Sequence, residues 1–365
     1  MGTLLVLLAA AALAQSAPQT LPAHTTENFR GVSAVSRQVA WASGTHGAYL
    51  RTTDGRLWIH DHVPNAESLD FRAVVAFSAD EAFLMSAGSG GQSRIYHTGD
   101  AGRHWQLQFT NQNPKGFFDS MVFWDHTLGD PIPDETGQLK FELLITGDGR
   151  TWTHIPSGQL PPAVEGEGAF AASNTCLAIL TQDESNIWFA TGGKTARVFH
   201  SSDRGRSWQV FDTPIVHGPD SAGIFSIAFR DPIHGVIAGG DYKHPEQDGP
   251  NLAFTNDGGK TWTLSKIFPQ SYYSALAYDR KNLARANADQ SKSSAKDSAK
   301  DSDENQSGIR FFLIGPKFVY DFRPPKNPTR ISPSKKSGTQ FNAVSPYPEG
   351  GALVVGPKGS IATIP

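Results

Sequence analysis

Apolar and small residues recur along the chain in a frame of seven positions. Each copy opens with an aromatic residue or glycine, has a second position that is often polar, and continues as a mostly apolar run. The third position is Gly, Ala or Ser in six of the seven copies, as expected where strands crowd toward a central axis. We interpret each copy as the innermost strand of a sheet. The copies span residues 29–35, 71–77, 118–124, 166–172, 223–229, 272–278 and 341–347.

A polar motif that ends in tryptophan lies between these frames. It begins with Thr or Ser two residues before an aspartate, contains glycine, and reaches the tryptophan four or five residues after the aspartate. The aspartates are 46 to 55 residues apart, which is the length of one four-stranded blade. We call the five copies the repeat turns; their aspartates are Asp54, Asp100, Asp148, Asp203 and Asp257, and their tryptophans are Trp58, Trp105, Trp152, Trp208 and Trp262.

The chemistry of the repeat turns predicts a structural role. An aspartate at the start of a turn can accept hydrogen bonds from the backbone N–H groups that follow it, and glycine supplies unusual backbone dihedrals. The tryptophan then enters the next strand and packs between sheets. Calcium binding or catalysis at these aspartates is the alternative, but five copies on five blades favour a brace for the turn.

The two repeats together predict an all-β fold, a seven-bladed β-propeller of four-stranded antiparallel blades. The last blade has only three strands of its own, so we expect residues 19–25 to supply its outer strand and close the ring 3 + 1. Blade six has no repeat turn and is interrupted by residues 281–308, rich in Ser, Ala, Asp and Lys, which predicts a disordered insertion. Residues 15–365 are expected to form this single domain.

Composition limits the classes of function. The 36 Gly and 24 Pro among 365 residues disfavour long helices, and a formal net charge of -3 lacks the basic surface of a nucleic-acid binder. Cys176 is the only cysteine, which excludes an intramolecular disulfide and predicts a buried thiol. The apolar run at residues 4–13, ending in Ala12-Leu13-Ala14, predicts a signal peptide over residues 1–14 and a periplasmic or secreted protein.

Charged side chains cluster at the second position of the frame, one step from the mouth of the predicted propeller. The mouth residues of interest there are Arg30, Arg72, Asp119, Glu167, Tyr273 and Asn342, and loops on the same face add His46, Asp130 and Asp241. These charges either neutralise one another or bind a ligand or partner segment that carries carboxylate or amide groups, with the arginines as bidentate donors. A third possibility is glycosidic acid/base catalysis by Asp119 and Glu167.

No catalytic signature or phosphate-binding loop is present, and we expect neither cofactor nor metal. The alternating pair His60 and His62 has spacing compatible with a metal site, but it falls on a predicted outermost strand, where solvated side chains are usual.

The repeat turns resemble the Asp-box, also called the bacterial neuraminidase repeat. Sialidases share that box, but they have six blades, an arginine triad and a Phe-Arg-Ile-Pro element, whereas here Phe29-Arg30 is followed by Gly31-Val32. The chain is more similar to the photosystem II stability/assembly factor family, through the boxes and phrases such as residues 228–235. The phrases at 117–121 and 167–173 look more like its non-photosynthetic relatives.

This resemblance implies an exported, non-catalytic scaffold, because photosynthetic members hold a membrane-protein subunit during assembly. We therefore expect a monomeric propeller that binds a protein or peptide partner through its top face. The alternative is a carbohydrate-active hydrolase that uses Asp119, Glu167 or Asp130.

Overall fold

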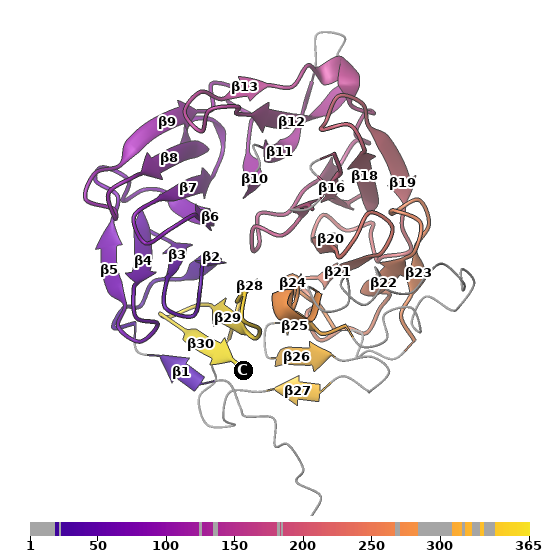
Figure 1. The fold of residues 1–365 in the computed structure, drawn as a ribbon. Coiled ribbons are helices and arrows are strands. Elements are labelled where there is room, and N and C mark those ends of the chain that lie inside the picture. The colour runs from indigo at the N-terminus through magenta and orange to yellow at the C-terminus, as the bar shows by residue number, and fades with distance from the viewer. Residues whose placement is uncertain are drawn as a thin grey trace, which may run out of the picture.

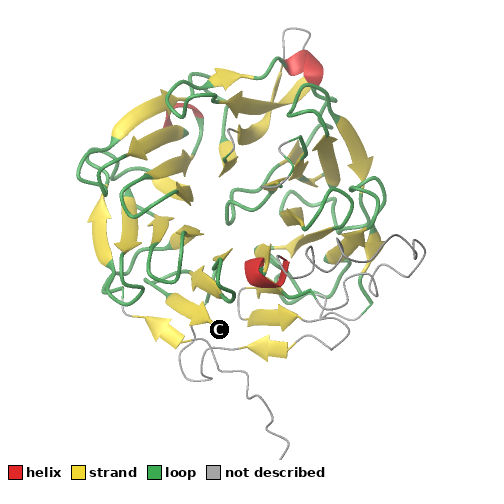
Figure 2. Ribbon diagram, in the orientation of Figure 1, coloured by secondary structure: helices red, strands yellow, loops and turns green. Residues whose placement is uncertain are grey.

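The computed structural model is built almost entirely of β-strands. Figure 1 shows the strands as sheets set around a central axis, and Figure 2 shows loops and a few helical turns between them. The structure describes residues 19–21, 23–123, 126–133, 138–180, 183, 185–266, 271–283, 309–315, 318–322, 329–331 and 340–365.

The described strands form antiparallel sheets, each running from an inner to an outer strand. Sheet one holds β2 (Phe29–Ala34), β3 (Ala40–Gly44), β4 (Ala48–Thr52) and β5 (Ile59–His62). Sheet two holds β6 (Asp70–Ala76), β7 (Ala82–Ala87), β8 (Arg94–Thr98) and β9 (Gln106–Thr110). Sheet three holds β10 (Phe118–Val122), β11 (His126–Pro133), β12 (Leu139–Ile145) and β13 (Thr153–His154).

The remaining sheets continue this order, with two additional short strands in sheet five. Sheet four holds β15 (Leu177–Ile179), β16 (Ile187–Ala190), β18 (Arg197–Ser201) and β19 (Gln209–Asp212). Sheet five holds β14 (Glu167–Gly168), β17 (Gly192–Gly193), β20 (Ala222–Phe229), β21 (Gly235–Asp241), β22 (Leu252–Thr255) and β23 (Thr263–Leu264). Sheet six holds β24 (Ala275–Tyr278), β25 (Phe311–Gly315), β26 (Phe318–Phe322) and β27 (Thr329–Ile331).

Sheet seven joins the two ends of the described chain. It holds β28 (Ala343–Pro346), β29 (Ala352–Val355), β30 (Ile361–Ile364) and β1 (Gln19–Leu21). Strand β1 pairs antiparallel with β30, with Gln19 opposite Thr363, as the sequence predicts for this segment. Two 3-10 turns, η1 (Gly90–Gln92) and η2 (Ser157–Gln159), and a helical turn at 280–283 are the helical parts of the described residues.

The core is divided into clusters that lie between neighbouring sheets. Phe29 and Leu50 of sheet one pack with Leu353 of sheet seven, and Trp41 of sheet one packs with Phe71 of sheet two. The second strands β3 and β7 are buried along their whole length, whereas the outermost strands β5 and β9 contain only half-buried and exposed residues. Burial is therefore greatest inside each sheet and decreases toward the rim.

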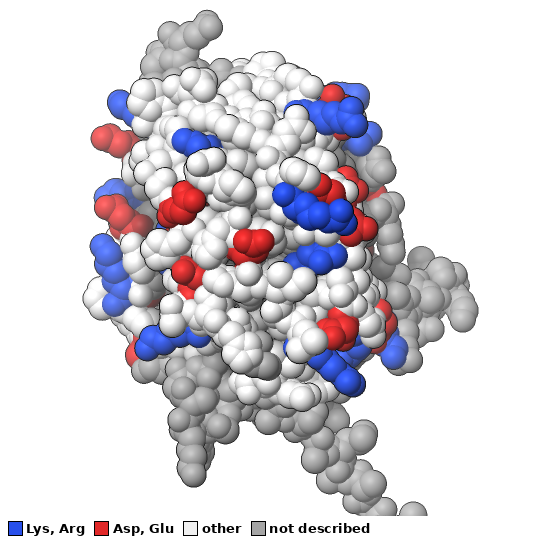
Figure 3. All heavy atoms as spheres, turned by 90° about the vertical axis from the view of Figure 1, so that its left-hand side faces the viewer, with Lys and Arg blue, Asp and Glu red and all other residues white. Residues whose placement is uncertain are grey.

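The rim carries charges of both signs. Figure 3 views the molecule from the side of sheets one and two, and acidic and basic side chains are interspersed there without a large field of one sign. Such a surface matches the near-zero net charge of the chain.

The repeat turns share one pattern of hydrogen bonds. In every copy the aspartate accepts a hydrogen bond from the backbone N–H of the residue just before the tryptophan, at 2.7–3.0 Å. The Thr or Ser two residues before the aspartate also accepts from a glycine N–H in every copy. Each turn is thus held by its own side chains and leads into the outermost strand.

Each tryptophan of a repeat turn packs in the cluster between its own sheet and the preceding one. Trp208 lies between sheets three and four, and Trp262 between sheets four and five. Trp152 and Trp208 are buried, at 7% and 8% exposure. Trp58, Trp105 and Trp262 are half-buried. The indoles therefore join adjacent sheets near their outer edges.

Two predicted boundaries need correction. No inner strand covers residues 166–172: β14 is a two-residue strand that pairs with β17, and β15 takes the innermost place of sheet four. The frame matched there because Gly and Ala are small, but small residues also suit a loop near a crowded axis. Residues 281–283 are helical, and Leu283 packs on the core between sheets five and six. Residues 284–308 and the predicted signal peptide at 1–14 lie outside the described residues.

No helix in the described part of the chain is long and apolar enough to span a membrane.

Removing a buried indole tests how tightly adjacent sheets pack. Trp208 contacts Phe189 with ring centroids 5.3 Å apart, and its Nε1 donates to the Gly205 carbonyl at 3.0 Å. Trp208→Ala leaves a cavity and should lower the free energy of unfolding by about 3–5 kcal/mol in urea denaturation. Leu57→Ala, at a side chain 74% exposed, should change it by less than about 0.5 kcal/mol. A loss below about 1 kcal/mol for Trp208→Ala would contradict this packing.

The aspartates of the repeat turns should also make the stability of the fold depend on pH. Hydrogen bonds, first from the Thr151 backbone N–H and then from that of Arg150, lower the pKa of Asp148 from 3.8 to about 2. The charged carboxylate therefore stabilises the fold above about pH 4, and this contribution is lost as the pH falls through about 2. In thermal unfolding, the stability gap between the wild type and Asp148→Asn should narrow from about pH 5 to about pH 3. A gap that stays constant or widens toward acid would refute this linkage.

Candidate binding site at the axial mouth

A loop crosses the centre of the ring and divides the space along the axis. Residues 169–176, here called the axial segment, connect β14 to β15 and reach toward the axis in Figure 1. Arg72 Nη1 of sheet two donates to the Ala171 carbonyl at 3.2 Å, and Ser173 Oγ donates to the Ser274 carbonyl, just before sheet six, at 2.7 Å. The segment is therefore bonded to opposite sides of the ring.

Two further sheets fix the axial segment. The side-chain oxygen of Asn174 accepts from Ser120 Oγ at 3.0 Å and from the Met121 N–H at 2.7 Å, both in sheet three. The Ile227 N–H of sheet five donates to the Thr175 carbonyl at 2.8 Å. Asn174 adopts a positive φ of 63°, a conformation that asparagine tolerates better than most residues.

On one side of the axial segment lies a cavity of about 460 Å³, which we call the mouth cavity. Its polar lining comes from Arg30, Arg72 and Asp119, the second positions of the first three inner strands. Its apolar lining comes from the axial segment, from Phe117 just before β10, and from aromatic residues in or beside sheets five and six. The sequence prediction that these three charged side chains lie around one opening agrees with this geometry.

The aromatic side of the mouth cavity is a packed cluster. Phe170 of the axial segment stacks on Phe225 with centroids 3.9 Å apart and an interplanar angle of 7°. Tyr272 meets Phe225 edge-on at 4.8 Å, and Tyr242, 48% exposed, lies at 6.2 Å. Burial raises the pKa of Tyr272, so its hydroxyl stays protonated. The cavity thus places a flat aromatic surface beside two guanidinium groups.

The two arginines of the mouth cavity differ in their bonding. Arg72 forms an ion pair with Asp70, Nε to Oδ2 at 2.8 Å. Arg30 is half-buried, and its Nε is buried without a hydrogen-bond partner among the described residues. Burial, followed by repulsion from the Arg72 charge, lowers the pKa of Arg30. A ligand anion between the two side chains would supply the partner that Arg30 lacks.

Glu167 does not line the mouth cavity, although it shares the second position of the frame. It is buried and accepts from Arg197 Nε at 3.0 Å, Thr191 Oγ1 at 2.6 Å and the Val164 N–H at 2.8 Å. Its position outside an inner strand follows from the corrected start of sheet four. The carboxylate braces β14 against the neighbouring strands rather than facing the cavity with Asp119.

The other predicted mouth residues lie apart from the cavity. Tyr273 is buried in the core, with its ring 6.1 Å from Tyr320. Asn342 donates to the Asn28 side chain and the Phe29 carbonyl, both at 2.8 Å, and so links sheet seven to sheet one. Both residues therefore contact other parts of the fold, and neither lines the mouth cavity.

The predicted loop residues form local contacts at the surface. His46, at a positive φ of 55°, pairs with Glu27 at 2.8 Å, and Asp241 pairs with His244 at 2.8 Å. Asp130 lies in β11, and its side chain is outside the description.

The candidate metal ligands and the cysteine of the sequence can be located in the described part of the chain. Within the described ranges, no three His, Cys, Asp or Glu side chains are grouped so that they could hold a metal ion. The rings of His60 and His62 lie 4.8 Å apart on the outermost strand β5. Cys176 is fully buried, and burial raises the pKa of its thiol.

Comparison with known proteins establishes the architecture. The sequence matches no protein-family model and no curated protein. Among solved structures, YCF48 bound to D1 peptide has a TM-score of 0.62 and 13% identity, covering 97% of this chain and 98% of that one. The WD40 β-propeller domain of Doa1 has a TM-score of 0.61 and 10% identity, covering 96% of each chain. This chain has a β-propeller fold.

A third similar structure is that of an enzyme. A catalytically inactive virginiamycin B lyase from Staphylococcus aureus, with quinupristin, has a TM-score of 0.62 and 10% identity, covering 95% of this chain and 98% of that one. At such identities the likeness concerns the propeller fold alone.

The second position of the frame predicted the charged lining of the mouth cavity, but it did not predict the aromatic lining. Phe225 is the single large residue at the third position of the frame, and Tyr272 stands at a first position. That exception was a usable signal, because a large side chain at a crowded position has to project somewhere. Phe170 had no such signal, since its place depends on the path of the axial segment.

The ion pair of Glu167 gives a test of its structural role. Arg197→Ala leaves the buried carboxylate without its charge partner and should lower the free energy of unfolding by about 3–5 kcal/mol in urea. Combining Arg197→Ala with Glu167→Gln should recover part of that loss, because no charge is then buried. If Arg197→Ala is as stable as the wild type, the ion pair contributes nothing to the fold.

Proposed function

We propose that this chain is a non-catalytic scaffold that binds a protein or peptide partner through the mouth cavity. The supporting observation is the pair Arg30 and Arg72 beside the aromatic cluster of Phe170 and Phe225. Guanidinium groups bind carboxylates and amide carbonyls through paired hydrogen bonds, and the flat rings suit an apolar side chain. A peptide segment with an acidic group next to an apolar residue offers both features.

The proposal includes a seven-bladed propeller over residues 15–365. The contact of sheet seven with sheet one and the pairing of β1 with β30 support a ring closed 3 + 1. The hydrogen bonds of the repeat turns support their interpretation as Asp-boxes. We further propose export after removal of residues 1–14, with a periplasmic or secreted location.

YCF48, which was solved with a D1 peptide, is similar in fold to this chain, so the fold is compatible with peptide binding. The partner of this chain is proposed to be a protein, as in an assembly-factor-like scaffold. A glycosidase that uses the pair Asp119 and Glu167 is disfavoured, since Glu167 is paired with Arg197 and only Asp119 of the two lines the cavity.

Arg30 allows binding to be separated from folding. Arg30→Gln removes a guanidinium that is half-buried, repelled by Arg72 and not bonded at Nε, so the melting temperature should stay the same or rise. Binding of carboxylate-bearing peptides should weaken at least about tenfold, because a charge-assisted hydrogen bond contributes about 1.5–3 kcal/mol.

The measurement is fluorescence polarisation with a panel of labelled peptides that carry acidic and apolar residues. Each peptide has a counterpart in which the carboxylates are replaced by amides. Arg103→Gln, at an exposed residue of a repeat turn, is the matched control and should bind as the wild type does. Equal affinities for wild type and Arg30→Gln would rule out the mouth cavity as the binding site.

A further inference from the structure

A second and larger cavity lies at the other end of the inner strands. Strand β20 carries Phe225 at the mouth cavity and Ile227 at this second cavity, and the chain through β24 does the same with Tyr272 and Leu276. The axial segment separates the two, because residues 169–172 line the mouth cavity while Asn174 and Thr175 line the second. We call the second one the base cavity; its volume is about 700 Å³.

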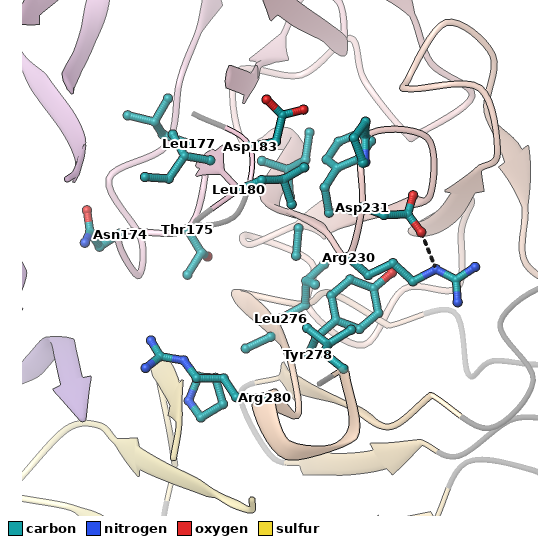
Figure 4. A pocket seen from close by; sticks show the side chains of 18 residues that line it. Asn174, Thr175, Leu177, Leu180, Asp183, Arg230, Asp231, Leu276, Tyr278 and Arg280 are labelled. Atoms are coloured by element: carbon teal, nitrogen blue, oxygen red, sulfur yellow. Dashed lines mark ion pairs between the residues drawn. The ribbon is translucent and has the colours of Figure 1, made fainter. Parts of the chain in front are cut away.

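The walls of the base cavity are mainly apolar. Ile227 lines it. Figure 4 shows Leu177, Leu180 and Leu276 around it, together with the ring of Tyr278. A cavity of several hundred cubic ångströms with apolar walls and a few converging polar groups is typical of sites for small organic ligands. The polar groups therefore decide which ligand fits.

Arg280 supplies a positive charge to the base cavity. Its side chain is exposed, and within the described residues it has neither an ion pair nor a hydrogen bond. Although the residue as a whole is exposed, the protein around it partly desolvates its guanidinium and lowers its pKa. A cation in such a setting is stabilised by any anion that enters the cavity.

The carboxylates of the base cavity are already engaged elsewhere. Asp231 pairs with Arg230 at 3.3 Å and with His234 at 2.8 Å. Asp183 accepts from the Ser185 N–H at 3.0 Å and from Asn186 Nδ2 at 2.7 Å. In Figure 4 both aspartates lie on the side of the cavity away from Arg280. The wall thus leaves the charge of Arg280 for a ligand.

Asn174 adds a hydrogen-bond donor on the same side as Arg280. Its side-chain oxygen accepts from Ser120 and Met121, which fixes the orientation of the amide. The amide nitrogen makes no hydrogen bond among the described residues, and in Figure 4 it points toward the side on which the Arg280 guanidinium lies. The base cavity is thus lined by one charged and one neutral donor.

We propose that the base cavity binds a monocarboxylate with an apolar body. Arg280 pairs with the carboxylate, Asn174 donates a hydrogen bond to it, and the body lies against the leucine and isoleucine side chains. This site is separate from the mouth cavity and does not depend on the function proposed for it. A free fatty acid and the carboxyl end of an apolar peptide share this chemistry.

Octanoate is a suitable probe, with octanamide as its neutral counterpart. Titration into the full chain with methyl-labelled Leu and Ile should shift the signals of Leu276 and Ile227, and octanamide should bind at least about tenfold more weakly. Arg280→Gln should weaken octanoate binding at least about tenfold, whereas Arg280→Lys should retain most of it. A tripeptide of leucines with a free or an amidated carboxyl end then distinguishes the two sources of the carboxylate.

Arg103→Gln is the matched control, because it removes a cation from an exposed repeat turn that lines neither cavity. It should leave the shifts of Leu276 and Ile227 unchanged. The proposal is overturned if octanoate gives no shift at these methyls at millimolar concentration, if Arg280→Gln binds it as the wild type does, or if Arg103→Gln abolishes the shifts.

Discussion

Each sheet of this propeller buries its two faces against two neighbours, and every other feature of the molecule is built on that mutual packing. Among the described residues the core clusters lie between consecutive sheets, and one of them joins sheet seven to sheet one. A four-stranded sheet alone would leave both apolar faces in water. The tryptophans of the repeat turns extend the same packing toward the rim, as Trp208 does against Phe189.

Near the central axis, the chain can depart from the regular strand pattern without disturbing the packing between sheets. Inner strands crowd together there, so small side chains and loops replace bulky ones. The axial segment uses this freedom: it leaves the strand pattern, crosses the centre and bonds to sheets two, three, five and six. Its hydrogen bonds fix a partition, and the two cavities lie on either side of it.

Both cavities place an arginine beside nonpolar side chains. At the mouth, Arg30 and Arg72 repel each other beside stacked aromatic rings, which favours an anionic segment with an apolar neighbour. At the base, Arg280 stands among aliphatic side chains while the nearby carboxylates are engaged by other residues. In both places the ligand that we propose carries an anionic group, which would lie beside an arginine. Buried charges that are fully paired, such as Glu167 with Arg197, serve the fold instead.

The periodic part of this protein could be predicted from the sequence alone. The frame located inner strands such as β2 and β20, and the repeat turns located the outer edges, because strand alternation and turn chemistry depend on neighbouring residues. It also brought Arg30, Arg72 and Asp119 to one opening, since equal positions in equal strands meet at the same end. The path of residues 169–176, the burial of Glu167 and the places of Phe170 and Arg280 emerged only in three dimensions. Those features depend on contacts across the axis between residues far apart in the chain, which no local pattern records.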